Sequence, residues 1–153
     1  MVVGIISDTH GLMRPEALNA LAGSSLIIHA GDVGGLEVLK ELRDIAPVFA
    51  VRGNVDTQSW AVALPATRVI SVGSYRFFVL HDISELAIDP VRQGVAAVVF
   101  GHSHKPSIEW RGDVLYLNPG SAGPRRFRLP VCVATVEIAG KRIRPRITRL
   151  DLP

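Results

Sequence analysis

Aspartate, asparagine and histidine side chains recur directly after five separate apolar segments of this sequence. They are Asp8 and His10, Asp32, Asn54 and Asp56, His81 and Asp82, and His102 and His104. Imidazole and carboxylate ligands together favour manganese, iron, zinc or nickel over calcium. Because the set contains no thiolate, it does not resemble a structural zinc site. The pattern predicts a site for divalent transition metals.

Two of these groups are pairs separated by a single residue. In an extended chain, residues i and i+2 point the same way. Asp8 with His10, and His102 with His104, could therefore each reach one side of a cluster. A loop could also divide each pair between two ions. Each short piece alone has an ordinary explanation as a turn or a surface histidine, so the prediction rests on the whole series.

Short strands and helices must position these side chains. Strand-like runs at 2–6, 25–30 and 48–51 alternate with helical stretches at 15–21 and 36–42. This alternation predicts βαβ units and a parallel sheet. In open α/β sheets, the loops at the carboxyl ends of the strands meet in one crevice. We therefore expect the polar loops to converge.

The second half of the chain is rich in strands. Glycine-containing turns separate paired apolar segments, which predicts hairpins at 67–80, 107–117 and 131–150. A further apolar strand at 95–100 ends in Gly-His-Ser-His. A mixed sheet, or two packed sheets with outer helices, would satisfy this pattern. The length of 153 residues suits one domain over 1–153.

Composition and charge limit the class of protein. The formal charge of +3 is too small to indicate nucleic-acid binding, but it favours anionic small molecules. The single cysteine, Cys132, cannot form an internal disulfide. The first residues carry no basic leader or cleavage-site pattern, and the apolar runs are too short to span a bilayer. We expect a cytoplasmic protein with no membrane partner.

The ordered motifs resemble the calcineurin-like metallophosphoesterase superfamily. They are Asp8-Thr-His10, Gly31-Asp32, Gly53-Asn54, His81 and Gly101-His102-Ser-His104. The short chain, the stretch Arg52-Gly53-Asn54-Val55-Asp56 and the run Asn118-Pro119-Gly120-Ser121 resemble its small prokaryotic phosphodiesterase branch. The resemblance runs from residue 2 to about 128. It implies an α/β fold, an αββα sandwich of two mixed β-sheets flanked by helices, with a binuclear site at one edge.

The resemblance also implies a role for each ligand. One ion would be held by Asp8, His10, Asp32 and His104, and the other by Asp32, Asn54, His81 and His102. Asp32 would bridge the ions, and Asp32, Asn54 and His81 would also be catalytic. The cofactors would be two divalent ions, with Mn²⁺ as first choice and iron, zinc or nickel as alternatives. Ions about 3.5–4 Å apart can generate a hydroxide that attacks phosphorus and can clamp the phosphoryl oxygens.

Two positions depart from the family pattern. Phosphatase members carry a histidine after the metal-binding asparagine, where it can protonate the leaving group, and this chain has Val55. The small phosphodiesterase branch usually lacks that histidine too, so phosphodiesters are favoured as substrates over monoesters. The branch often has His-Gly-His where this chain has His81-Asp82-Ile83, so Asp82 adds a negative charge near the site.

Several other residues have two interpretations. His29 lies inside a strand and is expected to be structural or to support the ligand loops. Arg125, Arg126 and Arg128 form either a solvated basic turn or a phosphate-binding segment. Trp60 and Trp110 are expected in core or oligomer packing rather than in stacking on a nucleobase.

A non-catalytic metal-binding scaffold with the same fold is the alternative to an enzyme, and the small retromer subunit is such a relative. A scaffold should have lost ligands, whereas all seven are present here, which favours the enzyme. A nuclease would need added DNA-binding segments, for which the chain has almost no room. We expect a small phosphate ester as substrate and no nucleic-acid partner, and we leave a homo-oligomer open.

Overall fold

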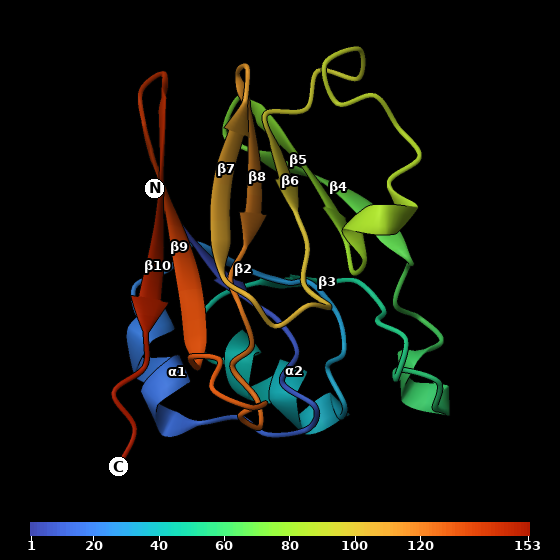
Figure 1. The fold of residues 1–153 in the computed structure, drawn as a ribbon, viewed down its shortest axis with the longest axis vertical. Coiled ribbons are helices and arrows are strands. Elements are labelled where there is room, and N and C mark those ends of the chain that lie inside the picture. Colours follow the sequence, from blue (N-terminus) through green and yellow to red (C-terminus); the bar gives the residue numbers. More distant parts are fainter.

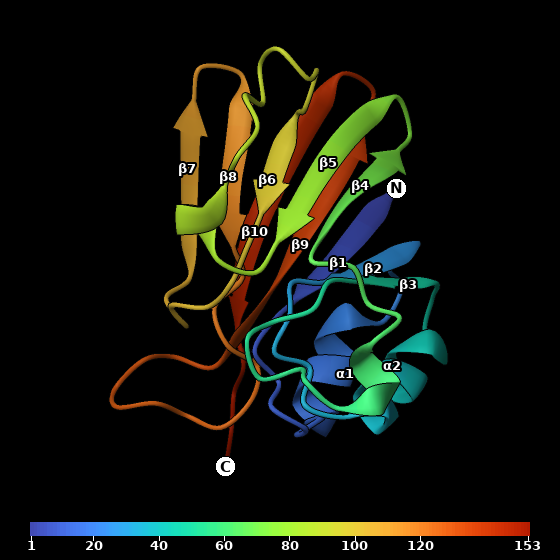
Figure 2. The same ribbon diagram turned by 90° about the vertical axis from the view of Figure 1, so that its right-hand side faces the viewer.

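A computed structural model describes residues 1–153 and contains two mixed five-stranded sheets packed face to face (Figures 1 and 2). The first sheet has the order β10-β9-β1-β2-β3 and the second β4-β5-β6-β8-β7. The strands are β1 Val2–Ile6, β2 Leu26–His29, β3 Val48–Ala50, β4 Thr67–Val72, β5 Tyr75–Leu80, β6 Ala97–Val99, β7 Ser107–Arg111, β8 Val114–Asn118, β9 Cys132–Ala139 and β10 Arg142–Arg149. The helices are α1 Pro15–Leu21 and α2 Leu36–Arg43, with 3₁₀ helices η1 Ser59–Ala61 and η2 Ile83–Glu85.

Apolar side chains from the facing surfaces of the two sheets form the central core. Ile5 and Ile28 of the first sheet are fully buried, as are Phe77, Val99 and Leu115 of the second. Each such side chain contributes about 1.5–3 kcal/mol when it leaves water. This core fixes the distance between the sheets, and so the distance between the loops that each sheet carries.

The outer faces of the two sheets are covered differently. Helices α1 and α2 pack on the first sheet through residues that include Leu21, Leu39 and Leu42. The second sheet is covered by the segment around η2, where Ile83 and Leu86 pack against the apolar cluster on that face. The two mixed sheets are as predicted. The expected helical cover of the second sheet is reduced to one 3₁₀ turn in a loop that leads to Pro90, a residue unsuited to a helix interior.

The strands that carry the polar loops run in matched directions. β1, β2 and β3 are parallel to one another, and β5 is parallel to β6. The three predicted hairpins form as β4–β5, β7–β8 and β9–β10. The loops after β1, β2, β3, β5 and β6 therefore meet at one edge of the sandwich, as expected from the sequence. No helix is long and apolar enough to cross a membrane.

Candidate metal centre

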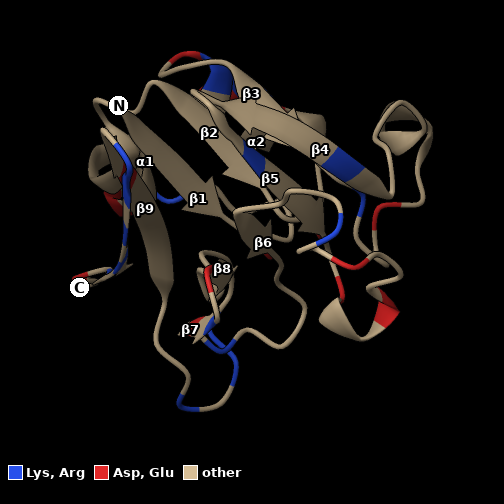
Figure 3. Ribbon diagram, turned by 90° about the horizontal axis from the view of Figure 1, so that it is seen from above, with Lys and Arg blue, Asp and Glu red and all other residues tan.

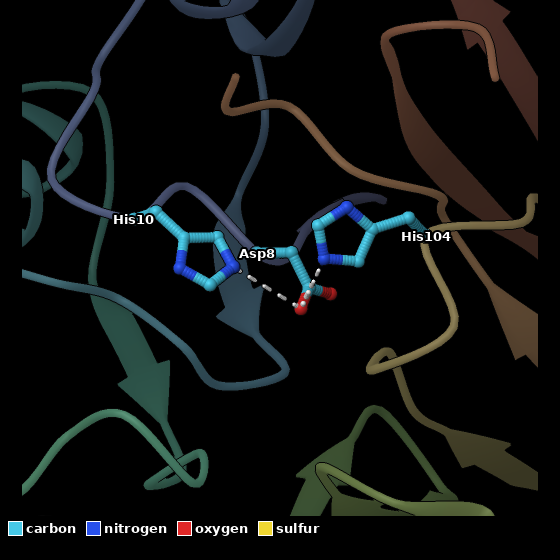
Figure 4. Close-up of side chains that lie close together, drawn as sticks. All are labelled: Asp8, His10 and His104. Atoms are coloured by element: carbon cyan, nitrogen blue, oxygen red, sulfur yellow. Dashed lines mark ion pairs between the residues drawn. The ribbon is translucent and has the colours of Figure 1, made fainter. Parts of the chain in front are cut away.

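Asp8, at the end of β1, lies at the centre of the converging loops and is fully buried. Its Oδ2 accepts hydrogen bonds from the Ser7 hydroxyl at 2.7 Å and from the His102 backbone N–H at 3.1 Å. Its Oδ1 accepts none, and lies 3.9 Å from His10 Nε2, 3.8 Å from His81 Nε2 and 3.3 Å from His104 Nε2. Figure 4 shows two of these imidazoles around the carboxylate. A buried carboxylate oxygen without a donor is unfavourable, so Oδ1 is arranged to meet a cation.

Asp32, which follows β2, lies between two of the histidines. Its Oδ1 accepts a hydrogen bond from the Val55 N–H at 3.0 Å. Its Oδ2 lies 3.1 Å from His81 Nε2 and 3.7 Å from His10 Nε2. The backbone after β3 therefore orients one oxygen, and the other faces both sides of the cluster.

His81 and Asn54 present their ligand atoms to the same point. His81 Nδ1 lies 2.8 Å from the Ala30 carbonyl oxygen, so Nδ1–H donates there and Nε2 is left free for a metal ion. The Asn54 amide oxygen lies 3.2 Å from His81 Nε2 and from both Asp32 oxygens. In the absence of a cation, a 180° rotation of the Asn54 amide would place its NH₂ group at this position, where it would donate hydrogen bonds to the same three atoms. A cation between these atoms would be coordinated by the oxygen in its present orientation.

The side chains form two overlapping groups of candidate ligands. Asp8, His10 and His104 make one, and Asp8, Asp32 and His81 make the other, with ligand atoms within 4.8 Å of one another in each. Buried Asp8 Oδ1 and His10 Nε2 have no hydrogen-bond partner. The donor set and these orphaned atoms both fit divalent transition metals. Both groups contain Asp8, whereas the family resemblance implies that Asp32 is the shared ligand.

His102 lies at the rim of the cluster and, like Asn54, is exposed. Its Nε2 is 3.8 Å from the Asp82 carboxylate, and its ring packs edge-on against His81 with centroids 5.2 Å apart. His104 instead faces Asp8, so the loop divides this pair. This agrees with the second of the two alternatives, because His102 and His104 have φ of 70° and 63° and are not extended.

Five of the predicted ligands adopt left-handed backbone conformations. Asp8, His10, Asp32, His102 and His104 have φ between 46° and 70°. Only one other non-glycine residue, Phe127, does so. Such a conformation costs on the order of 1–3 kcal/mol and persists where the surroundings enforce it, commonly at functional sites.

Two motif glycines allow the loops to approach this closely. A Cβ on Gly53 would overlap Asp32, and a Cβ on Gly101 would overlap Ser7 and approach the Asp8 carboxylate. The Gly53-Asn54 and Gly101-His102 motifs therefore need glycine on steric grounds.

The surroundings shift the pKa values of Asp32, His81 and His104 in different directions. Burial raises the pKa of Asp32, but hydrogen bonds from His81 and Val55 outweigh burial and leave it below its usual value. Burial lowers the pKa of His81, but the bond to Asp32 and the charge of Asp8 raise it overall. Burial holds the pKa of His104 below its usual value, because the opposing charge of Asp8 is partly offset by Arg126. A metal ion would displace the proton shared by His81 and Asp32.

His29 connects two ligand loops and lies outside the ligand cluster. Its Nδ1 accepts a hydrogen bond from the Gly31 N–H at 3.1 Å, and its Nε2 lies 3.0 Å from Thr9 Oγ1. The Thr9 hydroxyl donates to the Val33 carbonyl at 2.7 Å, so His29 is the donor to Thr9. Burial lowers the pKa of His29 to about 3. The neutral ring supports the loops, in agreement with the structural interpretation.

Two other residues support the ligand loops, and sequence reasoning did not identify this role for either. Asp56, one of the metal-capable residues after a strand, does not join the cluster, because its buried carboxylate accepts hydrogen bonds from the N–H groups of Val33, Gly34 and Gly53. The Asn118 amide donates to the Gly101 carbonyl, which braces the Gly-His-Ser-His loop. The bond depends on the pairing of β6 with β8, for which the sequence gives no signal.

A pocket of about 260 Å³ opens beside the second group of ligands. Its lining includes Arg52, Asn54, His81, Asp82, Glu85 and His102. Asp82 Oδ1 accepts hydrogen bonds from the Ser84 N–H and hydroxyl, so this carboxylate caps η2. Neither tryptophan lines the pocket: Trp60 packs beside the helices, and Trp110 lies half-exposed on β7.

Comparison with known protein families identifies this arrangement. The model of the calcineurin-like phosphoesterase superfamily domain matches residues 1–141. The chain belongs to this superfamily. The match confirms the resemblance drawn from the motifs.

Named relatives and a solved structure agree with the family. A probable metallophosphoesterase of Methanothermobacter thermautotrophicus is 33% identical over 165 residues, covering 100% of this chain and 95% of the relative. Phosphodiesterase MJ0936 of Methanocaldococcus jannaschii is 28% identical and covers 78% of this chain and 83% of its own length. The structure of Vps29 from Entamoeba histolytica complexed with zinc superposes with a TM-score of 0.74 at 24% identity, covering 99% of this chain and 100% of Vps29. The last comparison shows that the fold is shared.

Proposed function

We propose that this superfamily member hydrolyses phosphodiesters at a binuclear metal centre. The observation that carries the proposal is Asp8 Oδ1, a buried carboxylate oxygen without a donor that faces three imidazole nitrogens. One ion would be held by Asp8, His10, Asp32 and His104, and the other by Asp32, Asn54, His81 and His102, with Mn²⁺ as first choice. When bound, the ions would lower the pKa of a water molecule and polarise phosphoryl oxygens.

The residues of the chain orient these ligands and receive the substrate. The Ala30 carbonyl fixes the tautomer of His81, and the Val55 N–H fixes Asp32. Arg52 lines the pocket beside Asn54, where its charge favours an anionic phosphate.

The residue after Asn54 favours diesters over monoesters. Val55 cannot donate a proton to a leaving group, and the relative MJ0936 is called a phosphodiesterase. The substrate would be a small phosphodiester.

A metal-binding scaffold is the second candidate function. The fold is shared with Vps29, a vacuolar sorting protein that has been solved in complex with zinc. This candidate predicts tight metal binding without turnover.

The test is hydrolysis of bis(4-nitrophenyl) phosphate by purified protein that has been stripped with a chelator. Turnover should appear when Mn²⁺ is added and should be lost in Asp8→Asn, which keeps the shape of the side chain but removes its charge. Stoichiometric metal binding with no turnover of mono- or diesters, under every metal tried, would favour the scaffold instead.

A further inference from the structure

Phe127 has two features that packing does not explain. It is the one residue outside the predicted ligands and the glycines with a left-handed backbone, at φ 52°. Its side chain is 93% exposed, more than any other large apolar residue of the protein. It lies in the loop between β8 and β9, which projects from the body of the molecule in Figure 2. The fold thus holds a bulky aromatic ring in solvent on a strained backbone.

A hollow of about 640 Å³ lies beside Phe127 and is basic. Its lining residues are Ser103, Lys105, Arg126, Phe127, Arg128 and Leu129. Three of the six are cations and none is acidic. Lys105 and the two arginines form no ion pair. The lysine and arginine ion pairs of the protein are Lys40–Glu37 and Arg111–Glu109. Figure 3 shows basic residues along this projecting loop. The positive charge is therefore available to a ligand.

The hollow adjoins the loop that carries the candidate ligands His102 and His104. Ser103 lies between His102 and His104 in the chain, and Lys105 follows directly. The 260 Å³ pocket is lined by His102, whereas the hollow is lined by Ser103 and Lys105. A phosphodiester at the metal centre would thus have two neighbouring spaces, the pocket and the hollow, for its two ester groups.

We infer that this hollow binds the non-reacting part of the substrate, and that this part is a nucleotide. The inference rests on the proposed function. A base would stack on Phe127, because every nucleobase offers a flat face to an aromatic ring. A second phosphate would meet Arg126, Arg128 and Lys105, since guanidinium groups bind phosphate through paired hydrogen bonds. The volume of the hollow lies within the range of small-molecule sites.

Two diesters with the same leaving group test the inference. One is methyl 4-nitrophenyl phosphate, and the other is thymidine 3′-phosphate 5′-(4-nitrophenyl phosphate). The unmodified protein should have the higher kcat/KM for the thymidine diester. Phe127→Ala and Arg126→Ala should each lower the ratio of the two kcat/KM values about tenfold, because each removes one stacking or charge-assisted contact. Arg125→Ala is the matched control, since it removes a charge from the same loop outside the hollow, and the ratio should persist.

Binding to the metal-free protein supplies an independent measurement. Calorimetry with thymidine 3′,5′-bisphosphate in the presence of chelator should show binding that Phe127→Ala and Arg126→Ala weaken and Arg125→Ala does not. If both diesters are hydrolysed and no variant changes the ratio of their kcat/KM values, the inference is overturned and the proposed function is retained. Bisphosphate binding at the hollow with no hydrolysis of either diester would overturn the proposed function alone. A change of oligomeric state in Phe127→Ala, with the ratio unaltered, would assign the loop to contacts between copies and overturn the nucleotide site.

Discussion

Asp8 Oδ1 lies 3.3 Å from His104 Nε2, and the carboxylate is fully buried. Burial holds the pKa of His104 below its usual value, so a neutral imidazole faces a carboxylate oxygen that accepts no hydrogen bond. A divalent cation joins two such groups better than any arrangement of the side chains alone. The Asp8–His104 contact is therefore expected to depend on metal for its stability.

Mn²⁺ should raise the thermal midpoint of the protein. At a metal concentration of about one hundred times Kd, linkage contributes about 2.7 kcal/mol, or about 5–10 °C for a chain of this size. Differential scanning calorimetry of Asp8→Asn should show a much smaller increase. An equal increase in Asp8→Asn would place the bound metal elsewhere.

Asp32→Ala should be the most damaging single ligand substitution. Asp32 Oδ2 faces both His10 and His81, so its removal takes a contact from each side of the cluster. Metal analysis after dialysis should give a lower stoichiometry for Asp32→Ala than for His104→Ala. Retention of two metals and near-normal turnover in Asp32→Ala would show that Asp32 does not bridge.

Much of this site could be predicted from the sequence because its signal is local. Asp8, Asp32, Asn54, His81 and the Gly-His-Ser-His motif each follow an apolar run, and parallel strands carry their ends to one edge. The strand and helix boundaries follow from apolar runs and glycine turns in the same way.

The remaining features depend on contacts between distant segments. Asp56 has the residue type and position of a ligand, but the N–H groups of Val33 and Gly34 occupy its carboxylate. The division of His102 from His104 depends on backbone conformations that the neighbours of each residue impose. Phe127 is apolar and was expected in no site, and its exposure becomes apparent only when the loop is placed.

His29→Asn should reduce stability more than turnover. His29 is neutral in the fold with a pKa of about 3, against 6.5 for the free side chain. Between pH 6.5 and about 3, His29 binds a proton in the unfolded chain but not in the folded chain. The folded state therefore loses stability progressively as the pH falls through this range. The stability advantage of the unmodified protein over His29→Asn should therefore shrink over this window.

Denaturant unfolding of the chelator-treated proteins at several pH values measures this difference. A difference that stays constant with pH would contradict the neutral state of His29. A stable variant with turnover reduced a thousandfold would instead make His29 part of the reaction.

Gly101→Ala should disrupt the metal centre. The added Cβ would overlap the Ser7 hydroxyl and press on the Asp8 carboxylate. We expect a loss of about 1–3 kcal/mol in unfolding free energy, as for other overpacked sites, together with weaker metal binding. Gly35→Ala is the control, because a Cβ there meets nothing and φ is 177°. Equal metal affinity in the two variants would contradict the steric account.

Turnover should fall steeply as the pKa of the leaving group rises. A general acid contributes about 10²–10⁴-fold when it protonates the departing oxygen, and Val55 cannot do so. The buried Asp56 carboxylate is held by backbone N–H groups. Hydrogen bonds from Ser84 hold the pKa of Asp82 below its usual value, so Asp82 is a poor proton donor. Val55→His should flatten the dependence, measured over a series of aryl and alkyl phosphodiesters. A flat dependence in the unmodified protein would mean that another group supplies the proton.

The most direct test of the central claim is a titration of chelator-stripped protein with Mn²⁺, in which bound metal and hydrolysis of bis(4-nitrophenyl) phosphate are measured on the same samples. Turnover should rise with bound metal and reach its maximum at two ions per chain. Full occupancy without turnover, or turnover that does not change with bound metal, would contradict this claim.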